Sequence, residues 1–172
     1  MDIRAANSIK KITDAFIEMR RKKPVESISV TSLCKIAGVN KSTFYAHFQD
    51  IYDLTDKIEN MMVEEIVSSF DDPEDIMNGK KATEGLFKAY FEHSDMLNVV
   101  FSGSRSGFLA QKTEAGLKEA IFKLHPEYRS DLEMNVRLSI MIYGGFYAFS
   151  TNDSFDARRV IEIIGKFNNI SS

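Results

Sequence analysis

The stretch that most constrains the fold is SVTSLCKIAGVNKSTFYAHFQDIYD, residues 29–53. Ser29 is typical of a helix N-cap, because its hydroxyl accepts a hydrogen bond from a backbone N–H that the helix itself leaves unpaired. Ile28 and Leu33 have the spacing of a hydrophobic staple around that cap. Gly38 is expected to end the helix in the left-handed conformation, which glycine adopts at little cost. These residues predict one short helix.

A second short helix is predicted over residues 41–48, directly after that glycine. Asn40 is expected to cap it, and Val39 with Phe44 repeats the staple spacing. Phe44 and Phe48 are four residues apart, so they share the face that packs into a core. Two capped helices joined by a short glycine turn indicate a helix-turn-helix.

The outward face of this second helix is cationic, small and hydroxylated, and it consists of Lys41, Ser42, Thr43, Tyr45 and Ala46. Such a face suits a DNA groove. Lysine can contact phosphate or guanine, small residues allow close approach, and a tyrosine hydroxyl can contact a phosphate oxygen.

The stretch IAGVNKSTFYAHFQDIYDL resembles the signature of the TetR family of transcriptional regulators. The matching positions are Ala37, Gly38, Val39, Thr43, Phe44, Tyr45, His47, Phe48, Asp50 and Leu54. The motif resemblance covers residues 9 to about 54. It departs from the family pattern at Asn40, where a serine is usual, and at Ile51, where a lysine is usual. Thr31 stands where some members carry an arginine that reads guanine.

This resemblance implies a ligand-responsive repressor that binds a pseudo-palindromic operator on double-stranded DNA as a homodimer. It also implies which positions contact DNA, namely Thr31, Lys41, Ser42, Thr43, Tyr45, His47 and Lys57. A small-molecule effector of unknown identity would bind the rest of the chain and change the spacing of the two DNA-binding heads.

Charge is distributed unevenly along the 172 residues. Residues 1–50 carry nine Lys and Arg against five Asp and Glu, a net charge of +4, and the remainder carries 13 against 20, a net charge of −7. A basic head and an acidic body direct any polyanion to the head. We therefore predict a DNA-binding domain over residues 1–50 and an effector-binding and dimerisation domain over residues 51–172.

Helical periodicity without strand-like alternation predicts an all-α fold, with a three-helix DNA-binding head and a helical body. The first helix is expected from residue 7 or 8 to 21, with Ile9, Ile12, Phe16 and Met19 as its core stripe. Asp50 should cap a long helix over residues 50–70. The acidic run 71–75 is interpreted as a turn and helix start in preference to a cation site. Further helices are expected over residues 80–93, 94–101, 106–124, 127–150 and 154–169.

The last two of these helices are apolar on wide stripes, which a chain this small covers only with strain in a monomeric core, the competing interpretation. We therefore expect them to form a symmetric four-helix interface between two copies. Ile164 is the position at which a charge is expected to dissociate this dimer. Gly144 and Gly145, in the middle of the longer helix, are expected where a neighbouring helix or a ligand approaches the backbone closely.

Large apolar residues and a few polar ones in the body are candidates for an effector pocket. The candidates are Phe87, Phe91, His93, Phe101, Phe108, Asn135 and Tyr143, with Asn98, Arg105 and Gln111 as further polar candidates. For each aromatic residue, an ordinary core position is the competing interpretation.

Enzymatic motifs are not found in the sequence, so we expect neither an enzyme nor a cofactor or metal requirement. The one cysteine, Cys34, reads as a buried apolar residue. The sequence also lacks an apolar run of membrane-spanning length, and a cytoplasmic protein is expected. A DNA-bound scaffold that binds no effector remains the alternative; a body with no cavity would favour it.

Overall fold

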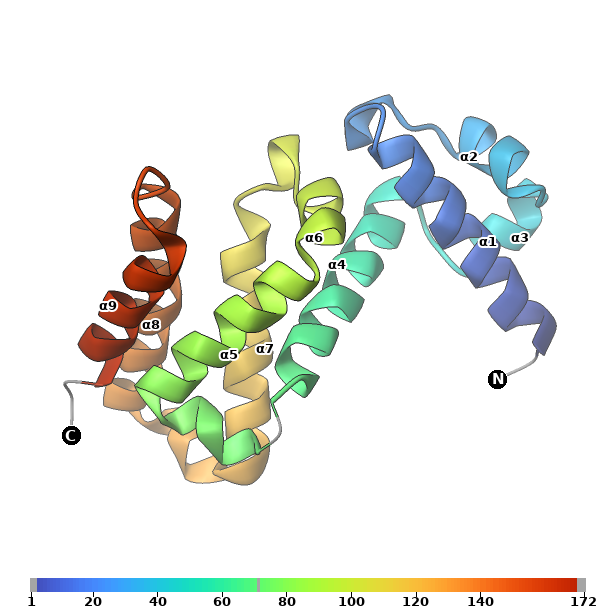
Figure 1. Ribbon diagram of the computed structural model, residues 1–172. Helices are drawn as coiled ribbons and strands as arrows, with labels where there is room; N and C mark the ends of the chain where they lie inside the picture. Colours follow the sequence, from blue (N-terminus) through green and yellow to red (C-terminus); the bar gives the residue numbers. More distant parts are fainter. Residues whose placement is uncertain (1–2, 71, 170–172) are drawn as a thin grey trace. The chain divides into compact units, whose positions relative to one another are not determined.

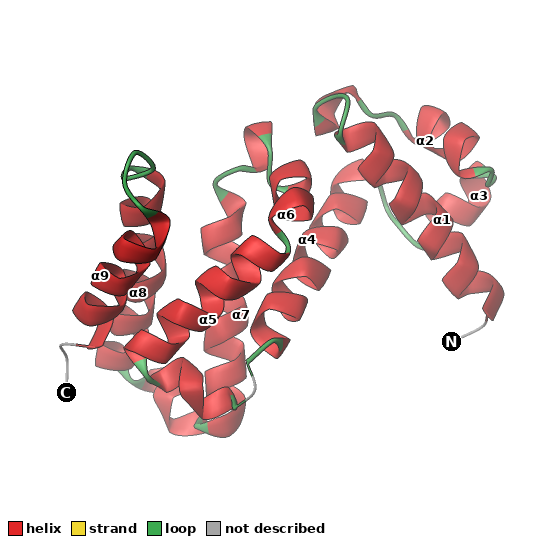
Figure 2. Ribbon diagram, viewed as in Figure 1, coloured by secondary structure: helices red, strands yellow, loops and turns green. Residues whose placement is uncertain are grey.

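The computed structural model describes residues 3–70 and 72–169, and these residues form an all-α fold without strands (Figures 1 and 2). The α-helices are α1 Ile3–Arg20, α2 Val30–Ala37, α3 Lys41–Tyr45, α4 Ile51–Ser68, α5 Gly79–Glu92, α6 Ser94–Val100, α7 Phe108–Leu124, α8 Leu132–Ser150 and α9 Ala157–Asn169. Short 3-10 helices lie between them: η1 Val25–Ser27, η2 Pro73–Met77, η3 Gly103–Arg105 and η4 Pro126–Ser130. The predicted all-α class is confirmed.

The chain divides into two compact units. The head unit contains Met1–Met61 together with Asp95–Ser106, and the body unit contains Met62–Ser94 together with Gly107–Ser172. This division differs from the predicted boundary at residue 50. The first part of α4 and most of α6 belong with the head, although α6 follows it in sequence by more than thirty residues.

Helix α2 begins and ends as its sequence predicts. The Ser29 hydroxyl accepts a hydrogen bond from the Ser32 N–H at 3.2 Å, and the Ser32 hydroxyl accepts one from the Ser29 N–H at 3.3 Å. These two bonds make a capping box. Gly38 has φ 64° and ψ 37°, the left-handed conformation, and the Val39 N–H donates to the Cys34 carbonyl at 3.1 Å. The latter bond is typical of a glycine-terminated helix.

Helix α3 departs from its prediction in two details. Asn40 has the extended backbone of an N-cap, but its side chain accepts no hydrogen bond from the helix. Since Asn40 is exposed, water can satisfy the N–H groups of the first turn. The helix also ends at Tyr45, before the predicted residue 48. The Phe48 N–H still donates to the Phe44 carbonyl at 2.9 Å, so the backbone makes one further helical turn.

The core of the head unit forms from side chains of the three helices that were predicted to share it, together with Leu54 of α4, which was not predicted to join them. Ile12, Phe16, Leu33, Phe44 and Leu54 are fully buried. They come from α1, α2, α3 and α4, which lie together in Figure 1. Burying a side chain of this size contributes about 1.5–3 kcal/mol, so these five residues fix the positions of the short helices α2 and α3.

Helix α4 is capped as predicted, since the Asp50 carboxylate accepts hydrogen bonds from the Tyr52 and Asp53 N–H groups, both at 2.8 Å. Asp53 reaches back to accept from the Gln49 N–H at 2.8 Å. That hydrogen bond and the neighbouring Lys57 lower the pKa of Asp53. The start of α4 is therefore held by two carboxylates, and the charged form of Asp53 is favoured by its partners.

The body unit buries a cluster of α7 and α8 side chains around η2, namely Ile76, Leu117, Ile121, Phe122, Leu138 and Ile142.

Asp71 lies outside the described residues. Its neighbour Asp72 accepts a hydrogen bond from the Glu74 N–H at 2.9 Å, which caps η2. The helix predicted over residues 127–150 begins later than expected, because Pro126 begins η4. Helix α8 starts only after Asp131, whose carboxylate accepts from the Met134 N–H at 3.0 Å.

Candidate nucleic-acid interface

The residues predicted to face DNA lie on the outer surface of α2 and α3. Lys41, Ser42 and Tyr45 are exposed, with Tyr45 at 57% exposure, and Thr31 on α2 is exposed as well. The Tyr45 ring packs edge-on against the buried Phe44 ring, with centroids 5.4 Å apart. One face of this single turn of helix is thus held in the core while the other presents an ammonium group and hydroxyl groups to solvent.

Thr43 and His47 are partly buried, so they present less surface than their neighbours on α3. The His47 ring packs against Phe48, with centroids 6.3 Å apart. Both residues flank the exposed face rather than form its centre.

Lys57 has a different environment from the one predicted for it. Its ammonium group donates to the His47 carbonyl at 2.9 Å and forms an ion pair with Asp53 at 2.9 Å. It also lies 5.1 Å from the centroid of the Phe48 ring. Lys57 therefore ties the segment after α3 to α4, and its charge is matched by Asp53 within the head unit.

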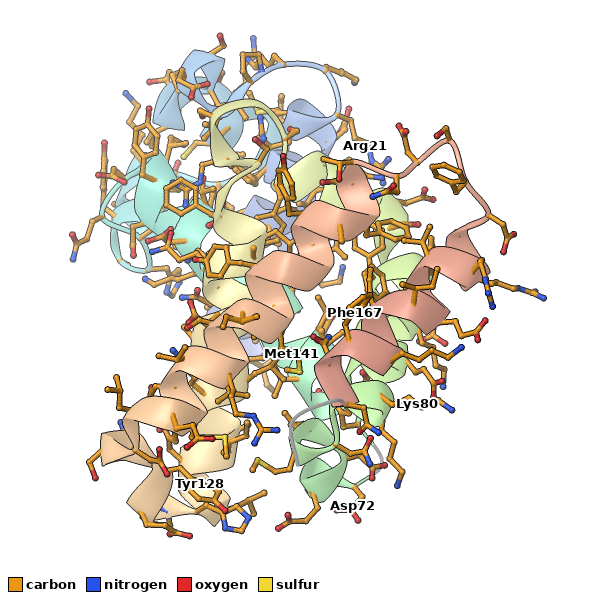
Figure 3. The ribbon with its side chains drawn as sticks, turned by 90° about the vertical axis from the view of Figure 1, so that its left-hand side faces the viewer. Arg21, Asp72, Lys80, Tyr128, Met141 and Phe167 are labelled. Carbon is orange, nitrogen blue, oxygen red and sulfur yellow. The ribbon has the colours of Figure 1, made fainter. Side chains whose placement is uncertain are left out.

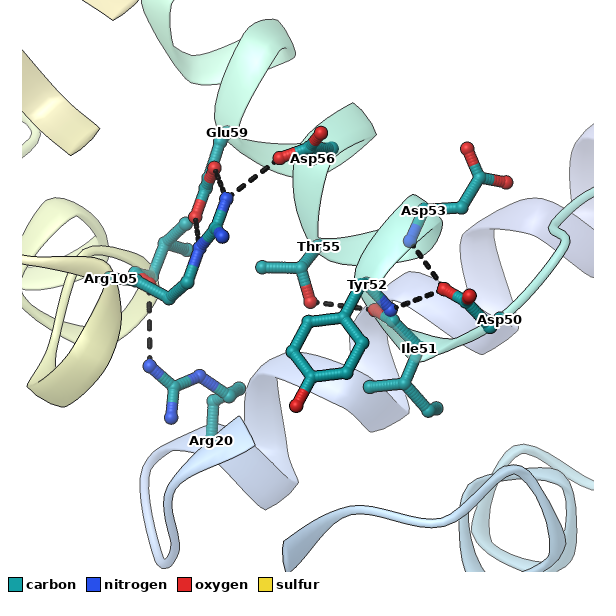
Figure 4. Close-up of polar contacts among 10 residues, drawn as sticks. Arg20, Asp50, Ile51, Tyr52, Asp53, Thr55, Asp56, Glu59 and Arg105 are labelled. Carbon is teal, nitrogen blue, oxygen red and sulfur yellow. Dashed lines mark hydrogen bonds and ion pairs between the residues drawn. The ribbon is translucent and has the colours of Figure 1, made fainter. Parts of the chain in front are cut away.

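A polar network that sequence reasoning missed joins α6 and η3 to the rest of the head unit (Figure 4). Glu59 on α4 is fully buried, and its carboxylate accepts two hydrogen bonds from Arg105, from Nε at 2.7 Å and from Nη2 at 2.6 Å. Arg105 also pairs with Asp56 at 2.7 Å. The hydrogen bonds to Glu59 raise the pKa of Arg105 in spite of its burial. Arg105, a candidate effector contact from sequence, is thus a structural residue of the head.

Arg20, the last residue of α1, holds the end of α6 in the same network. It is 5% exposed and donates to the Val99, Val100 and Ser102 carbonyls at 3.2, 3.3 and 3.2 Å, and to the Ser102 hydroxyl at 2.7 Å. Burial lowers the pKa of this guanidinium, while the nearby carboxylates of Glu26 and Glu59 oppose the shift. A cation at a helix C-terminus complements the helix dipole and satisfies carbonyls that the helix leaves unpaired.

The predicted effector residues are dispersed. Phe101 is buried in the head unit, and the other six lie in the body unit. Phe87 is buried against Phe149, with ring centroids 4.7 Å apart. Phe91 is 47% exposed, and its ring lies 5.8 Å from that of Phe149. Phe108, the first residue of α7, is partly buried.

The polar members of that set are engaged with nearby groups. The His93 ring lies 4.0 Å from the Glu65 carboxylate. The Asn135 amide donates to the Asp131 and Tyr128 carbonyls at 2.8 and 3.1 Å, so it supports the η4–α8 connection. Tyr143 is 45% exposed on α8. Within the described body unit, the six residues that belong to it are therefore spread over several helices and engaged in separate local contacts.

Among the hollows that open on the described part of the body unit, four have volumes of about 280, 140, 120 and 20 Å³. Among the seven predicted residues, Phe87 lines the smallest of these four. Ligand pockets in proteins usually measure about 300–1,000 Å³, so each of the four is smaller than that range.

An apolar stripe is exposed along α8, and it consists of Leu132, Val136, Ile140, Tyr143 and Tyr147. Steps of three and four residues place these side chains on one face of the helix. On α9, Ile163 and Phe167 are exposed in the same way, at 41% and 72%. Figure 3 shows α8 and α9 adjacent on this side of the body. We call the seven residues the apolar face.

Ile164, Gly144 and Gly145 differ in how deeply they are buried in the body unit. Ile164 is 7% exposed, and its side chain lies against Gly145, 3.5 Å from where a Cβ would stand. The expected close approach thus occurs at Gly145 and comes from α9. Gly144 is exposed with open space above it. A charge at Ile164 would disrupt packing inside the body unit, so this residue is unsuitable as a specific test of dimerisation.

Within residues 3–70 and 72–169, no group of three or more His, Cys, Asp or Glu side chains is arranged to hold a metal ion. Helices of membrane-spanning length and hydropathy are likewise not found in the described part of the chain. No model of a known protein family matches the sequence, and no curated protein is significantly similar to it.

Proposed function

We propose that this chain is a DNA-binding transcriptional regulator that acts as a homodimer, most simply a ligand-responsive repressor of the TetR type, in the cytoplasm. The observation that carries the proposal is the division of α3 into two faces. Phe44 is fully buried, while Lys41, Ser42 and Tyr45 are exposed on a short, rigidly held turn. A protruding helix with an ammonium group and hydroxyl groups fits a major groove, where such groups contact phosphates and base edges.

Charge supports the same assignment. Residues 1–50 have a net charge of +4 and the remainder −7. Neutralised phosphates release counterions, so binding should weaken steeply with salt and should involve the head. The acidic body disfavours any other approach to the polyanion.

The homodimer is supported by the apolar face on α8 and α9. Leu132, Tyr147 and Phe167 are 79%, 73% and 72% exposed. Contiguous apolar surface of this kind is typical of protein interfaces, and a face used by two identical copies makes a twofold-symmetric dimer. Two copies would present two α3 helices to a pseudo-palindromic operator.

A repressor that responds to a ligand needs a body whose shape differs between the free and bound states, so that ligand and operator affinities are coupled. The alternative is a DNA-bound scaffold that dimerises and recruits a partner without any effector. The small volumes of the four described hollows favour this second candidate. Operator affinity measured with and without a metabolite extract separates the two, since the scaffold predicts no change.

Tyr45→Phe is expected to weaken binding to every duplex by a similar factor of about 2–10, because a lost hydrogen bond to phosphate carries no base information. Fluorescence anisotropy with a preferred duplex and a scrambled one, at one salt concentration, measures both affinities. Tyr128→Phe removes a hydroxyl from the body unit and is the matched control, expected to leave both affinities unchanged. A change in preference between the two duplexes would show that Tyr45 reads bases.

A further inference from the structure

A hollow of about 140 Å³ opens on the body unit between α8, the end of α9 and residues 76–79. Figure 3 shows Met141 and Phe167 in the space between α8 and α9, where this hollow lies. Its lining is largely apolar and consists of Ile76, Met77, Gly79, Met134, Arg137, Leu138, Ile140, Met141, Phe167 and Asn168.

Arg137 is the one charged side chain in this lining. It is partly buried, and within the described part of the chain it makes no hydrogen bond or ion pair. Its neighbours on the body surface differ, since Arg129 pairs with Glu119 at 3.2 Å and Arg159 with Glu162 at 2.8 Å. A guanidinium with five N–H donors beside apolar surface is complementary to a carboxylate, which it can bind through two parallel hydrogen bonds.

The size and composition of the hollow define the rest of the ligand. A cavity of about 150 Å³ lined by apolar side chains accommodates benzene, and 140 Å³ is close to that volume. Met77, Met134 and Met141 have flexible, polarisable side chains that adapt to an irregular apolar group. A long aliphatic tail is too large for this volume. A multiply charged ligand would have only one cation, Arg137, to pair with.

We propose that this hollow is a binding site for a small organic monoanion, with its carboxylate on Arg137 and an apolar body about the size of one benzene ring among the methionines. The proposal that the hollow binds such an anion does not depend on whether the chain binds DNA. As the effector site it rests on the function proposed above, and it replaces the dispersed set of aromatic residues predicted from sequence.

Met141 also lines the adjacent hollow of about 20 Å³, together with Phe87, Ile142 and Gly145. Asn168 lines both hollows as well, so Met141 and Asn168 lie at the boundary between two apolar spaces. Truncation by Met141→Ala should join them and admit a larger apolar body, such as 2-naphthoate, more readily than the wild-type chain does.

Isothermal titration of the full chain with benzoate, and with benzyl alcohol as the uncharged analogue, tests the site. We expect benzoate to bind with a dissociation constant of about 1 mM or lower and benzyl alcohol at least tenfold more weakly. Arg137→Met should reduce benzoate binding to the level of the alcohol, and Arg137→Lys should give an intermediate value. Arg158→Met removes an exposed arginine of α9 outside the hollow and is expected to change neither affinity.

Benzoate and benzyl alcohol binding equally to the wild-type chain would overturn the proposal, as would a benzoate affinity that Arg137→Met leaves unchanged. Ile140 and Phe167 belong both to this lining and to the apolar face, so a second copy could fill the hollow. If the wild-type chain binds no benzoate at 10 mM, the hollow is not such a site, and the proposal is overturned. Because the titration contains no DNA, a failure here is distinct from a failure to bind an operator.

Discussion

Arg105→Met is expected to destabilise the head unit by about 3–5 kcal/mol, the effect of removing one partner from a buried ion pair. The variant deletes the hydrogen bonds of 2.7 and 2.6 Å to a Glu59 carboxylate that has no exposed surface. Native-state hydrogen exchange measures the result by region. Amides of α1, α4 and α6 should lose protection, while those of α7 and α8 in the body unit should retain theirs.

Two further variants test the reason for that loss. In Glu59→Leu/Arg105→Met both members of the pair are absent, and most of the lost stability should return because no buried Glu59 carboxylate is then left without its Arg105 partner. Asp56→Asn removes a carboxylate that is 57% exposed and should cost at most about 1 kcal/mol. A double variant no more stable than Arg105→Met alone would contradict this explanation.

Tyr147→Asp is expected to weaken the proposed dimer by about 2–4 kcal/mol, or roughly 30- to 1,000-fold in dissociation constant. Tyr147 is 73% exposed near the end of the apolar face, so a carboxylate there costs the monomer little. In the dimer the same carboxylate would be buried against apolar side chains. Analytical ultracentrifugation gives the dissociation constant, and operator binding should be lost over the same concentration range.

Leu124→Asp provides the matched control, because Leu124 is 45% exposed on α7 and lies outside the apolar face. It should leave the dimer intact. A wild-type chain that sediments as a monomer at micromolar concentration would contradict the dimer itself, and equal effects of the two variants would contradict the location of its interface.

Local motifs were predictable from sequence because each depends on residues a few positions apart. Ser29, Gly38 and Asp50 occupy the helix ends assigned to them, with the expected hydrogen bonds or backbone conformation. The prediction for Asn40 was half right. Its backbone conformation follows from its place before a helix, but an exposed side chain has water as an alternative to the cap hydrogen bond.

Long-range polar pairing was not predictable in this way. Arg105 pairs with a residue 46 positions away, and Arg20 binds groups 79 to 82 positions away. In the sequence, Arg20 belongs to the run of basic residues 20–23, and Arg105 was interpreted as a candidate effector contact. The available signal in the sequence was a glutamate, Glu59, directly beside the apolar position Ile58 of α4, because a carboxylate buried on that face needs a partner.

The effector residues failed as a set for a related reason. Aromatic residues such as Phe87 and Phe101 are as suited to a core as to a pocket wall, and both are buried in cores, one in each unit. Composition alone does not distinguish these environments. Arg137 went unnoticed because its position beside a hollow depends on the packing of α8 with α9 and η2.

We propose that two copies of this chain bind double-stranded DNA through α3. Selection of bound sequences from a random duplex library tests this proposal most directly. The full chain should enrich an inverted repeat whose half-site centres lie about 10–10.5 bp apart, or a multiple of that spacing. Lys41→Ala should reduce the enrichment and also the dependence of affinity on salt. If the protein is folded and dimeric but enriches no inverted repeat, the proposed recognition of DNA by two copies of α3 is contradicted.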